Sequence, residues 1–302
     1  MDLSRAKTVL IITFLLLNIF LLYHIFENEA GTSDFFSQEE NITRLEEALD
    51  EAELAIDIPL PRGGMRCAYL VVEPWRIEEE KLIAELWNVF EGEERALPEV
   101  LIESSYISQN GIGTEVGEEV FTYYFGDYEI AFRDEGSFAF ERQSIPEDES
   151  EDEFTVEDHV EIAEDYIEQI SFMQGFSYDF YKMNEDQVIL YFSQEFEGFP
   201  LYTGYLELFM KREHIEKFHL YRLQPREFAE QTREIIPPSN ALLRFLEAHR
   251  GGFSGAEIVE FSLGYYSQKY DADRWEIPPV WRIRLNNGEI YYINAFTGSL
   301  ER

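Results

Sequence analysis

Hydrophobic and polar positions divide this chain into one long apolar run and a mixed remainder. The run covers residues 9–26 and is interrupted only by Thr13, Asn18 and His24. As a helix rising about 1.5 Å per residue it spans roughly 27 Å, which suits the hydrocarbon core of a bilayer. A cleaved signal peptide, the alternative, has a shorter apolar region and small residues at its cleavage site. The pattern therefore predicts a retained transmembrane helix over residues 9–26.

Charged residues on either side of this run predict its orientation. Arg5 and Lys7 precede it, whereas Glu27, Glu29 and a strongly acidic remainder follow it. Short positively charged flanks stay on the cytoplasmic side of a membrane. We therefore expect a single-pass protein of the cell membrane, with a cytoplasmic tail of residues 1–8 and an extracytoplasmic C-terminal part.

The remainder alternates between segments with helical spacing of apolar residues and segments rich in Phe, Tyr, Val and Ile. The first kind predicts helices at 38–54, 78–90, 155–173 and 240–249. The second kind predicts strands at 67–72, 119–125, 128–133, 137–143, 187–192, 205–210, 215–220, 256–263, 281–285 and 289–294. This mixture predicts an α+β fold in which helices pack on antiparallel sheets with one buried face.

An acidic segment predicts where the extracytoplasmic part divides. Six of the eight residues from 146 to 153 are Asp or Glu, which is typical of a solvated linker. We expect a membrane-proximal α+β domain at 27–146, a linker at 147–154 and a C-terminal α+β domain at 155–302.

A repeat within the C-terminal domain predicts two related units. The tripeptide Gly-Phe-Ser follows a predicted helix at residues 175–177 and again at 252–254, with a proline at a similar distance beyond each. We therefore predict tandem αβββ units at 155–225 and 236–302. The alternative is that the tripeptide recurs by chance in a chain rich in Phe.

Composition narrows the functional classes. The chain has 24 basic and 61 acidic residues and a formal net charge of −37. Such a surface repels phosphate backbones and anionic lipid head groups, which argues against nucleic-acid binding. We interpret the charge as solubility in a salty or alkaline exterior rather than as capture of a ligand. The single cysteine cannot form an internal disulfide.

Candidate catalytic chemistry is sparse in the sequence. The four histidines beyond the apolar run are scattered, and no Gly-x-Ser-x-Gly motif, phosphate loop or Cys-His pair is present. Asp271 and Asp273 lack the rest of a calcium loop. We therefore predict that the protein is not an enzyme and binds no metal or cofactor.

Asn18 is the residue of the apolar run that most suggests a contact. An amide at mid-membrane is costly unless it bonds to another helix, which is worth about 0.6–2 kcal/mol. A lone Asn tolerated without a partner is the alternative. The predicted partner-binding face of the helix consists of Ile11, Phe14, Leu15, Asn18, Leu21 and Leu22.

Both ends of the chain resemble known families. The segment PVWRIRLNNG at 279–288, followed by YYINAFTG at 291–298, resembles the final hairpin of PepSY-type domains, which are small extracytoplasmic α+β modules for binding and inhibition. The segment MDLSRAKT at 1–8, followed by IITFLLLNIFL at 11–21, resembles the N-terminus of the YycI (WalI) family. That family consists of membrane-anchored accessory proteins of the WalK–WalR two-component system.

The YycI resemblance implies a regulator without enzymatic activity. Its expected partners are a WalK-like (YycG-like) sensor histidine kinase, a YycH-like sister protein and membrane lipid. Binding through the transmembrane helix and the ectodomain would adjust signalling for cell-wall metabolism. The alternative is an extracytoplasmic PepSY-like module that binds a ligand or inhibits a peptidase independently of the kinase.

Overall fold

The computed structural model describes most of the chain beyond residue 37. The described residues are 13–14, 17–18, 38–61, 64–92, 95–111, 114–134, 136–144, 154–184, 187–249, 253, 255–270 and 272–301. No helix within these ranges is both long and apolar enough to cross a membrane. The predicted cytoplasmic tail lies outside them. So do the acidic linker, apart from Phe154, and most of the predicted transmembrane run.

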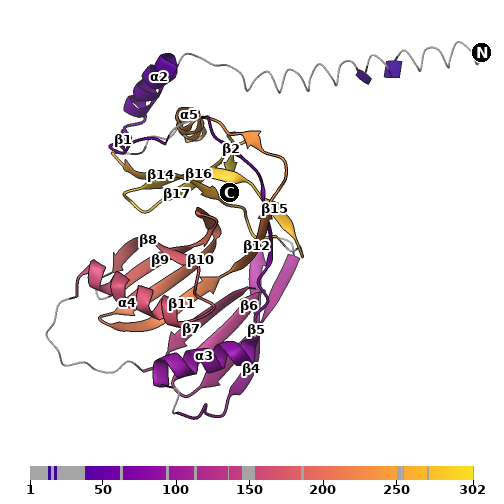
Figure 1. Cartoon of the computed structure of the whole chain (residues 1–302), viewed down its shortest axis with the longest axis vertical. Coiled ribbons are helices and arrows are strands. Elements are labelled where there is room, and N and C mark those ends of the chain that lie inside the picture. Colours follow the sequence, from indigo (N-terminus) through magenta and orange to yellow (C-terminus); the bar gives the residue numbers. More distant parts are fainter. Residues whose placement is uncertain are drawn as a thin grey trace, which may run out of the picture.

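Eight antiparallel strands form the largest part of the molecule (Figure 1). They are β4 (Leu101–Gly111), β5 (Thr114–Phe125), β6 (Tyr128–Asp134), β7 (Ser137–Arg142), β8 (Phe176–Asn184), β9 (Gln187–Phe196), β10 (Phe199–Lys211) and β11 (His214–Tyr221). Their order across the sheet is β4-β5-β6-β7-β11-β10-β9-β8. The strands before and after the acidic segment therefore meet at the β7–β11 pair, where Phe140 lies opposite Phe218.

Two helices, α3 (Glu79–Glu91) and α4 (Val156–Gln169), contribute to the same hydrophobic core as this sheet. The apolar side of α3 buries Leu82, Ile83 and Leu86, and α4 buries Ala163 and Ile167. Helix α4 begins at a capping box, in which Thr155 and Asp158 satisfy each other's backbone N–H groups. Periodicity in the sequence thus corresponds to buried helix faces on an aromatic sheet.

A second hydrophobic core joins α2 (Gln38–Glu51), near the start of the described residues, to the C-terminal strands. It lies between α2, α5 (Pro238–Ala248) and a smaller group of strands (Figure 1). Those strands are β1 (Ala55–Ile56), β14 (Glu257–Tyr265), β16 (Pro279–Leu285), β17 (Ile290–Asn294) and β18 (Leu300–Glu301). Strand β1 pairs in parallel with β14, and Ala55 donates to the carbonyl of Ala256 at 3.0 Å. Leu45 and Leu49 of α2 share this core with Leu242 of α5, so α2 is bound to the C-terminal part.

Two small sheets connect the larger parts. One consists of β12 (Leu223–Phe228), β3 (Leu70–Pro74) and β15 (Trp275–Ile277), and the other of β13 (Arg233–Glu234) and β2 (Arg66–Cys67). The first sheet contributes to a third core, in which Leu70 and Ile277 pack with Leu201 of β10 and Tyr265 of β14. This third core therefore ties the eight-stranded sheet to the C-terminal strands.

Strand β10 carries the junction between the two parts. Its pairing with β9 shifts register between Leu201 and Tyr205, and Leu201 pairs in parallel with Tyr265 of β14. The residues within this irregularity, 202–204, are all buried. Thr203 bonds through its hydroxyl to both backbone groups of Ser267, at 3.0 and 3.1 Å. The bulge thus turns β10 from one sheet towards the other.

The coarse fold prediction is confirmed: the structure is mixed α+β, with mostly antiparallel sheet and four helices, α2 to α5, among residues 38–301. Each predicted helix overlaps one of these four. The sequence prediction lacks β4 and β8 of the eight-stranded sheet, and also the short strands β1, β12, β13, β15 and β18. Strand β4 is mostly polar, and a bulge between Tyr178 and Phe180 interrupts the alternation in β8. The predicted division into domains stays a prediction.

We expect the substitution Gly204→Ala to destabilise the protein by about 1–3 kcal/mol, because it overpacks the β10 bulge. A Cβ atom at Gly204 would lie 2.3 Å from the side-chain oxygen of Gln194. Gln194 cannot move away freely, because its amide donates to the carbonyl of Leu223 and accepts from the N–H of Leu223. Urea unfolding of the detergent-solubilised full chain measures the change.

The matched control for this experiment is the double variant. Gln194→Ala removes the atom that the new methyl group strikes, so Gly204→Ala with Gln194→Ala should cost less than the sum of the two single changes. Strict additivity would contradict the proposed clash.

Candidate functional site

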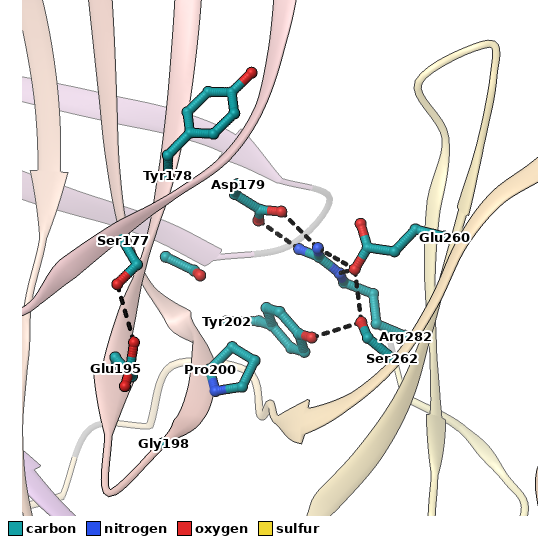
Figure 2. A pocket seen from close by; sticks show the side chains of 11 residues that line it. Ser177, Tyr178, Asp179, Glu195, Gly198, Pro200, Tyr202, Glu260, Ser262 and Arg282 are labelled. Carbon is teal, nitrogen blue, oxygen red and sulfur yellow. Dashed lines mark hydrogen bonds and ion pairs between the residues drawn. The ribbon is translucent and has the colours of Figure 1, made fainter. Parts of the chain in front are cut away.

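The side chain of Arg282 lies buried between strands from distant parts of the chain (Figure 2). It belongs to β16, and only 4% of it is exposed. The guanidinium donates to both carboxylate oxygens of Asp179 on β8 and to Glu260 on β14. An unpaired ion in a protein interior costs several kcal/mol, so these two carboxylates are what allows Arg282 to be buried there. We call Arg282, Asp179, Glu260, Tyr202 and Ser262 the junction cluster.

Tyr202 covers the guanidinium from the β10 bulge. Its ring centroid lies 4.1 Å from the central carbon of Arg282, and its hydroxyl lies 2.8 Å from that of Ser262. Burial raises the pKa of Tyr202 to about 12, so the phenol stays neutral. Gly264 on β14 leaves space for this ring, because a Cβ atom there would lie 2.4 Å from it. The approach of β10 to β14 and the burial of the Arg282 ion pairs therefore depend on the same residues, Tyr202 and Gly264.

Glu260 connects the two arginines of β16. One of its carboxylate oxygens accepts from Arg282 and Ser262, and the other accepts from Arg284 at 2.9 Å. Burial acts to raise the pKa of Glu260, but the charge of Arg282 and the hydrogen bonds of the cluster outweigh burial and hold that pKa below its usual value. Burial likewise acts to lower the pKa of Arg282, but the hydrogen bonds and charge of Asp179 raise it overall. Both groups stay charged at neutral pH.

A cleft of about 210 Å³ opens beside the cluster. Its lining consists of Ser177, Tyr178, Asp179, Ser193, Glu195, Gly198, Pro200, Tyr202, Glu260, Ser262 and Arg282. No His or Cys is among these residues. The hydroxyl of Ser262 donates to Glu260, but a carboxylate held by two arginines is a weak base. The arrangement therefore suits a fixed structural connection better than nucleophilic catalysis.

Metal binding finds no support in the residues that the structure describes. They contain no group of three or more His, Cys, Asp or Glu side chains that could hold a metal ion.

The predicted site residues lie in the apolar run, and the structure describes two of them. Phe14 and Asn18 are helical and exposed. Ile11, Leu15, Leu21 and Leu22 lie outside the described residues, as do the two topology residues, Arg5 and Lys7. The predicted contact face therefore stays a prediction.

Sequence reasoning missed the junction cluster. One signal was present: Arg282 and Arg284 alternate with Trp281 and Ile283 in a predicted strand, so both cations share one face. Their carboxylate partners were not recognisable among 61 acidic residues.

We expect Arg282→Leu to destabilise the full chain by about 3–5 kcal/mol, because it leaves Asp179 buried without its cation and Glu260 with Arg284 alone. Arg244→Leu is the matched control. It removes an exposed pair with Glu247 and should cost less than about 1 kcal/mol. Urea unfolding of both variants measures the difference. Equal free energies of unfolding for the two variants would mean that the junction cluster does not hold the two groups of strands together.

We expect the stabilising effect of Glu260 to depend on pH. Its pKa in the folded protein is lowered, so its contribution is present above the unfolded pKa of about 4.5 and is lost as pH falls through the folded value. Glu260→Gln should therefore be less stable than the wild type at about pH 7, and the gap should narrow by about pH 3.5. Thermal unfolding at both pH values measures this gap, and a gap independent of pH would contradict the ionic role.

One solved structure shares this fold. An uncharacterized protein from Eubacterium rectale ATCC 33656, solved as a crystal structure, superposes with a TM-score of 0.54 at 15% identity. The match covers 86% of this chain and 98% of that one. The C-terminal domain of YpeB from Bacillus megaterium superposes with a TM-score of 0.38 at 13% identity, covering 76% of this chain and 97% of that domain. No curated protein sequence matches.

The family comparison is more specific. The model of the YycI protein family matches residues 138–296, which include the strands of the junction cluster and more than half of the chain. The resemblance noted at the N-terminus is thereby confirmed by a separate region. The chain belongs to the YycI protein family.

Proposed function

We propose that this protein is a membrane-anchored regulator without enzymatic activity that binds a WalK-like sensor histidine kinase and a YycH-like sister protein. Binding through the transmembrane helix and the ectodomain would modulate two-component signalling for cell-wall metabolism. The observation that carries this proposal is the family match over residues 138–296, because YycI proteins are accessory regulators of the WalK–WalR system. The location follows from the same membership, because the family is membrane-anchored.

The packing of α2 supports a role in transmitting position from the membrane to the ectodomain. Leu45 and Leu49 of this helix are buried in the C-terminal core. Immediately after α2, the backbone carbonyl of Glu53 accepts from the N–H of Gly255 at 3.1 Å. The carbonyl of Ala52 accepts from the N–H of Phe253 at 3.0 Å. Helix α2 is therefore part of a folded core with the C-terminal strands. A shift of α2 would move the C-terminal part with it.

A regulator of this kind acts by differential binding. A helix that packs better against one kinase conformation than against another shifts the kinase population, and a few kcal/mol of difference are enough. The junction cluster supports this interpretation, because Arg282 and the neighbouring Arg284 are committed to ion pairs within the chain. The ectodomain would then contribute to regulation through its position.

A second candidate function is a PepSY-like module that binds a ligand or inhibits a peptidase without the kinase. It is favoured by a recurring order of elements: α4 precedes β8–β11, and α5 precedes β14, β16, β17 and β18, with neighbouring strands paired in each set. This order resembles the predicted tandem PepSY-like αβββ units, but each set has four strands where three were predicted. An ectodomain without residues 1–32 that rescues a deletion strain would favour this candidate over the kinase complex.

We expect Asn18→Leu to reduce co-purification of the full chain with the kinase from membranes. Loss of one interhelical hydrogen bond, about 0.6–2 kcal/mol, corresponds to a loss of about three- to thirtyfold in affinity. Asn18→Gln keeps the amide and is the matched control. Undiminished recovery of the kinase with Asn18→Leu would show that the amide does not contribute to the contact.

A further inference from the structure

Strand β4 is an open edge of the eight-stranded sheet. Within the residues that the structure describes, it pairs with β5 alone, in eleven consecutive residue pairs without a register shift. Its other edge therefore presents free backbone N–H and C=O groups. Proteins normally protect such edges with short strands, bulges, proline or lysine. The sequence of β4, LIESSYISQNG, is eleven residues long and contains neither proline nor lysine.

Exposed apolar side chains gather near the start of this edge. Leu101 is 61% exposed and Ile102 is 60% exposed, with Leu97 at 42% before them and Phe121 at 40% on the neighbouring strand. We call these four residues the β4 patch. Solvent-exposed aliphatic side chains beside an unprotected strand edge mark a contact surface for another protein.

The opposite outer strand, β8, differs in this respect. Its Asp179 is bound to Arg282, and a Cβ atom at Gly288 of the C-terminal hairpin would lie 3.2 Å from the side chain of Lys182. Strand β8 is therefore in contact with the C-terminal part.

The charge near the β4 edge determines which kind of partner segment can bind there. The sequence from 101 to 125 contains four glutamates (Glu103, Glu115, Glu118 and Glu119) and no Lys, Arg or His. A second copy of this chain would bring exposed Glu103 to the contact and a net charge of −37 behind it. An extended segment with Lys or Arg side chains would instead be attracted.

We propose that the β4 edge is the docking site for a basic, extended segment of a partner protein, which adds a ninth strand to the sheet. Backbone hydrogen bonds to β4 would supply affinity, and the β4 patch together with the glutamates would select the partner. This inference rests on the proposed function, because it identifies the partner as the extracytoplasmic part of the kinase or of the sister protein. Strand β4 and helix α2 lie at opposite ends of the molecule (Figure 1), so this contact is separate from any contact made at the membrane.

The test uses the full chain co-expressed with the kinase and the sister protein in membranes. Ile102→Lys places a positive charge on the edge, which hinders pairing of a further strand and repels a basic segment. We expect this variant to lower recovery of the partner by about tenfold. Met183→Lys is the matched control, because Met183 is 64% exposed on the other outer strand. It should leave recovery unchanged. Thermal unfolding of both variants confirms that each is folded.

A photo-crosslinking residue at position 101, compared with one at exposed Tyr181, locates the contact. We expect position 101 to crosslink to a segment of the kinase or sister protein that contains Lys or Arg, identified by mass spectrometry. A crosslink to a second copy of this chain, or to an acidic segment, overturns the proposal.

Two further outcomes separate this inference from the proposed function. Full recovery of the complex with Ile102→Lys, without a crosslink from position 101, overturns the β4 site and leaves the proposed function intact. Failure of the wild-type chain to recover either partner overturns both.

Discussion

The structure depends on the burial of one positive charge between two sheets. Arg282 can lie in the interior only while Asp179 and Glu260 hold its guanidinium, because an uncompensated ion there costs several kcal/mol. Asp179 is 103 residues from Arg282 in the sequence, so this requirement fixes the approach of strands that no local interaction would bring together. Hydrophobic burial stabilises the cores, and the third core also joins β10 to β14. The ion pairs specify how the cores are placed relative to one another.

The surrounding backbone is shaped to permit this arrangement. The bulge of β10 directs Tyr202 towards Arg282, and two glycines make the close approach possible. Gly204 leaves space for Gln194, and Gly264 leaves space for the ring of Tyr202. Helix α2 then joins this unit to the start of the ectodomain, because its apolar residues share a core with α5. From α2 through the junction cluster to the β7–β11 pair, the chain forms a continuous series of packed contacts.

Local patterns in the sequence were sufficient for much of this fold. Helical spacing located all four helices between residues 38 and 249, and aromatic strands such as β6 and β7 were recognisable from Phe and Tyr. The missing strands lack such patterns: β4 is mostly polar, and β8 contains Asp179 and a bulge. Pairing between distant residues has no local signal, so the partners of Arg282 could not be inferred in a chain with 61 acidic residues. The predicted membrane contacts fall mostly outside the described residues, and the structure leaves them as predictions.

The packing of α2 onto the C-terminal part affects how weak contacts at separate places on the protein add together. One interhelical hydrogen bond, about 0.6–2 kcal/mol, is too small to specify a complex alone. A second contact made by the same chain becomes effectively intramolecular once the first has formed, and the combined affinity then exceeds that of either contact. This gain is lost where the geometry forbids both contacts from forming at once, so it depends on where the protein holds its binding surfaces. The buried ion pairs of the junction therefore have a role beyond stability, because they hold the distal edge of the sheet at a defined position relative to α2.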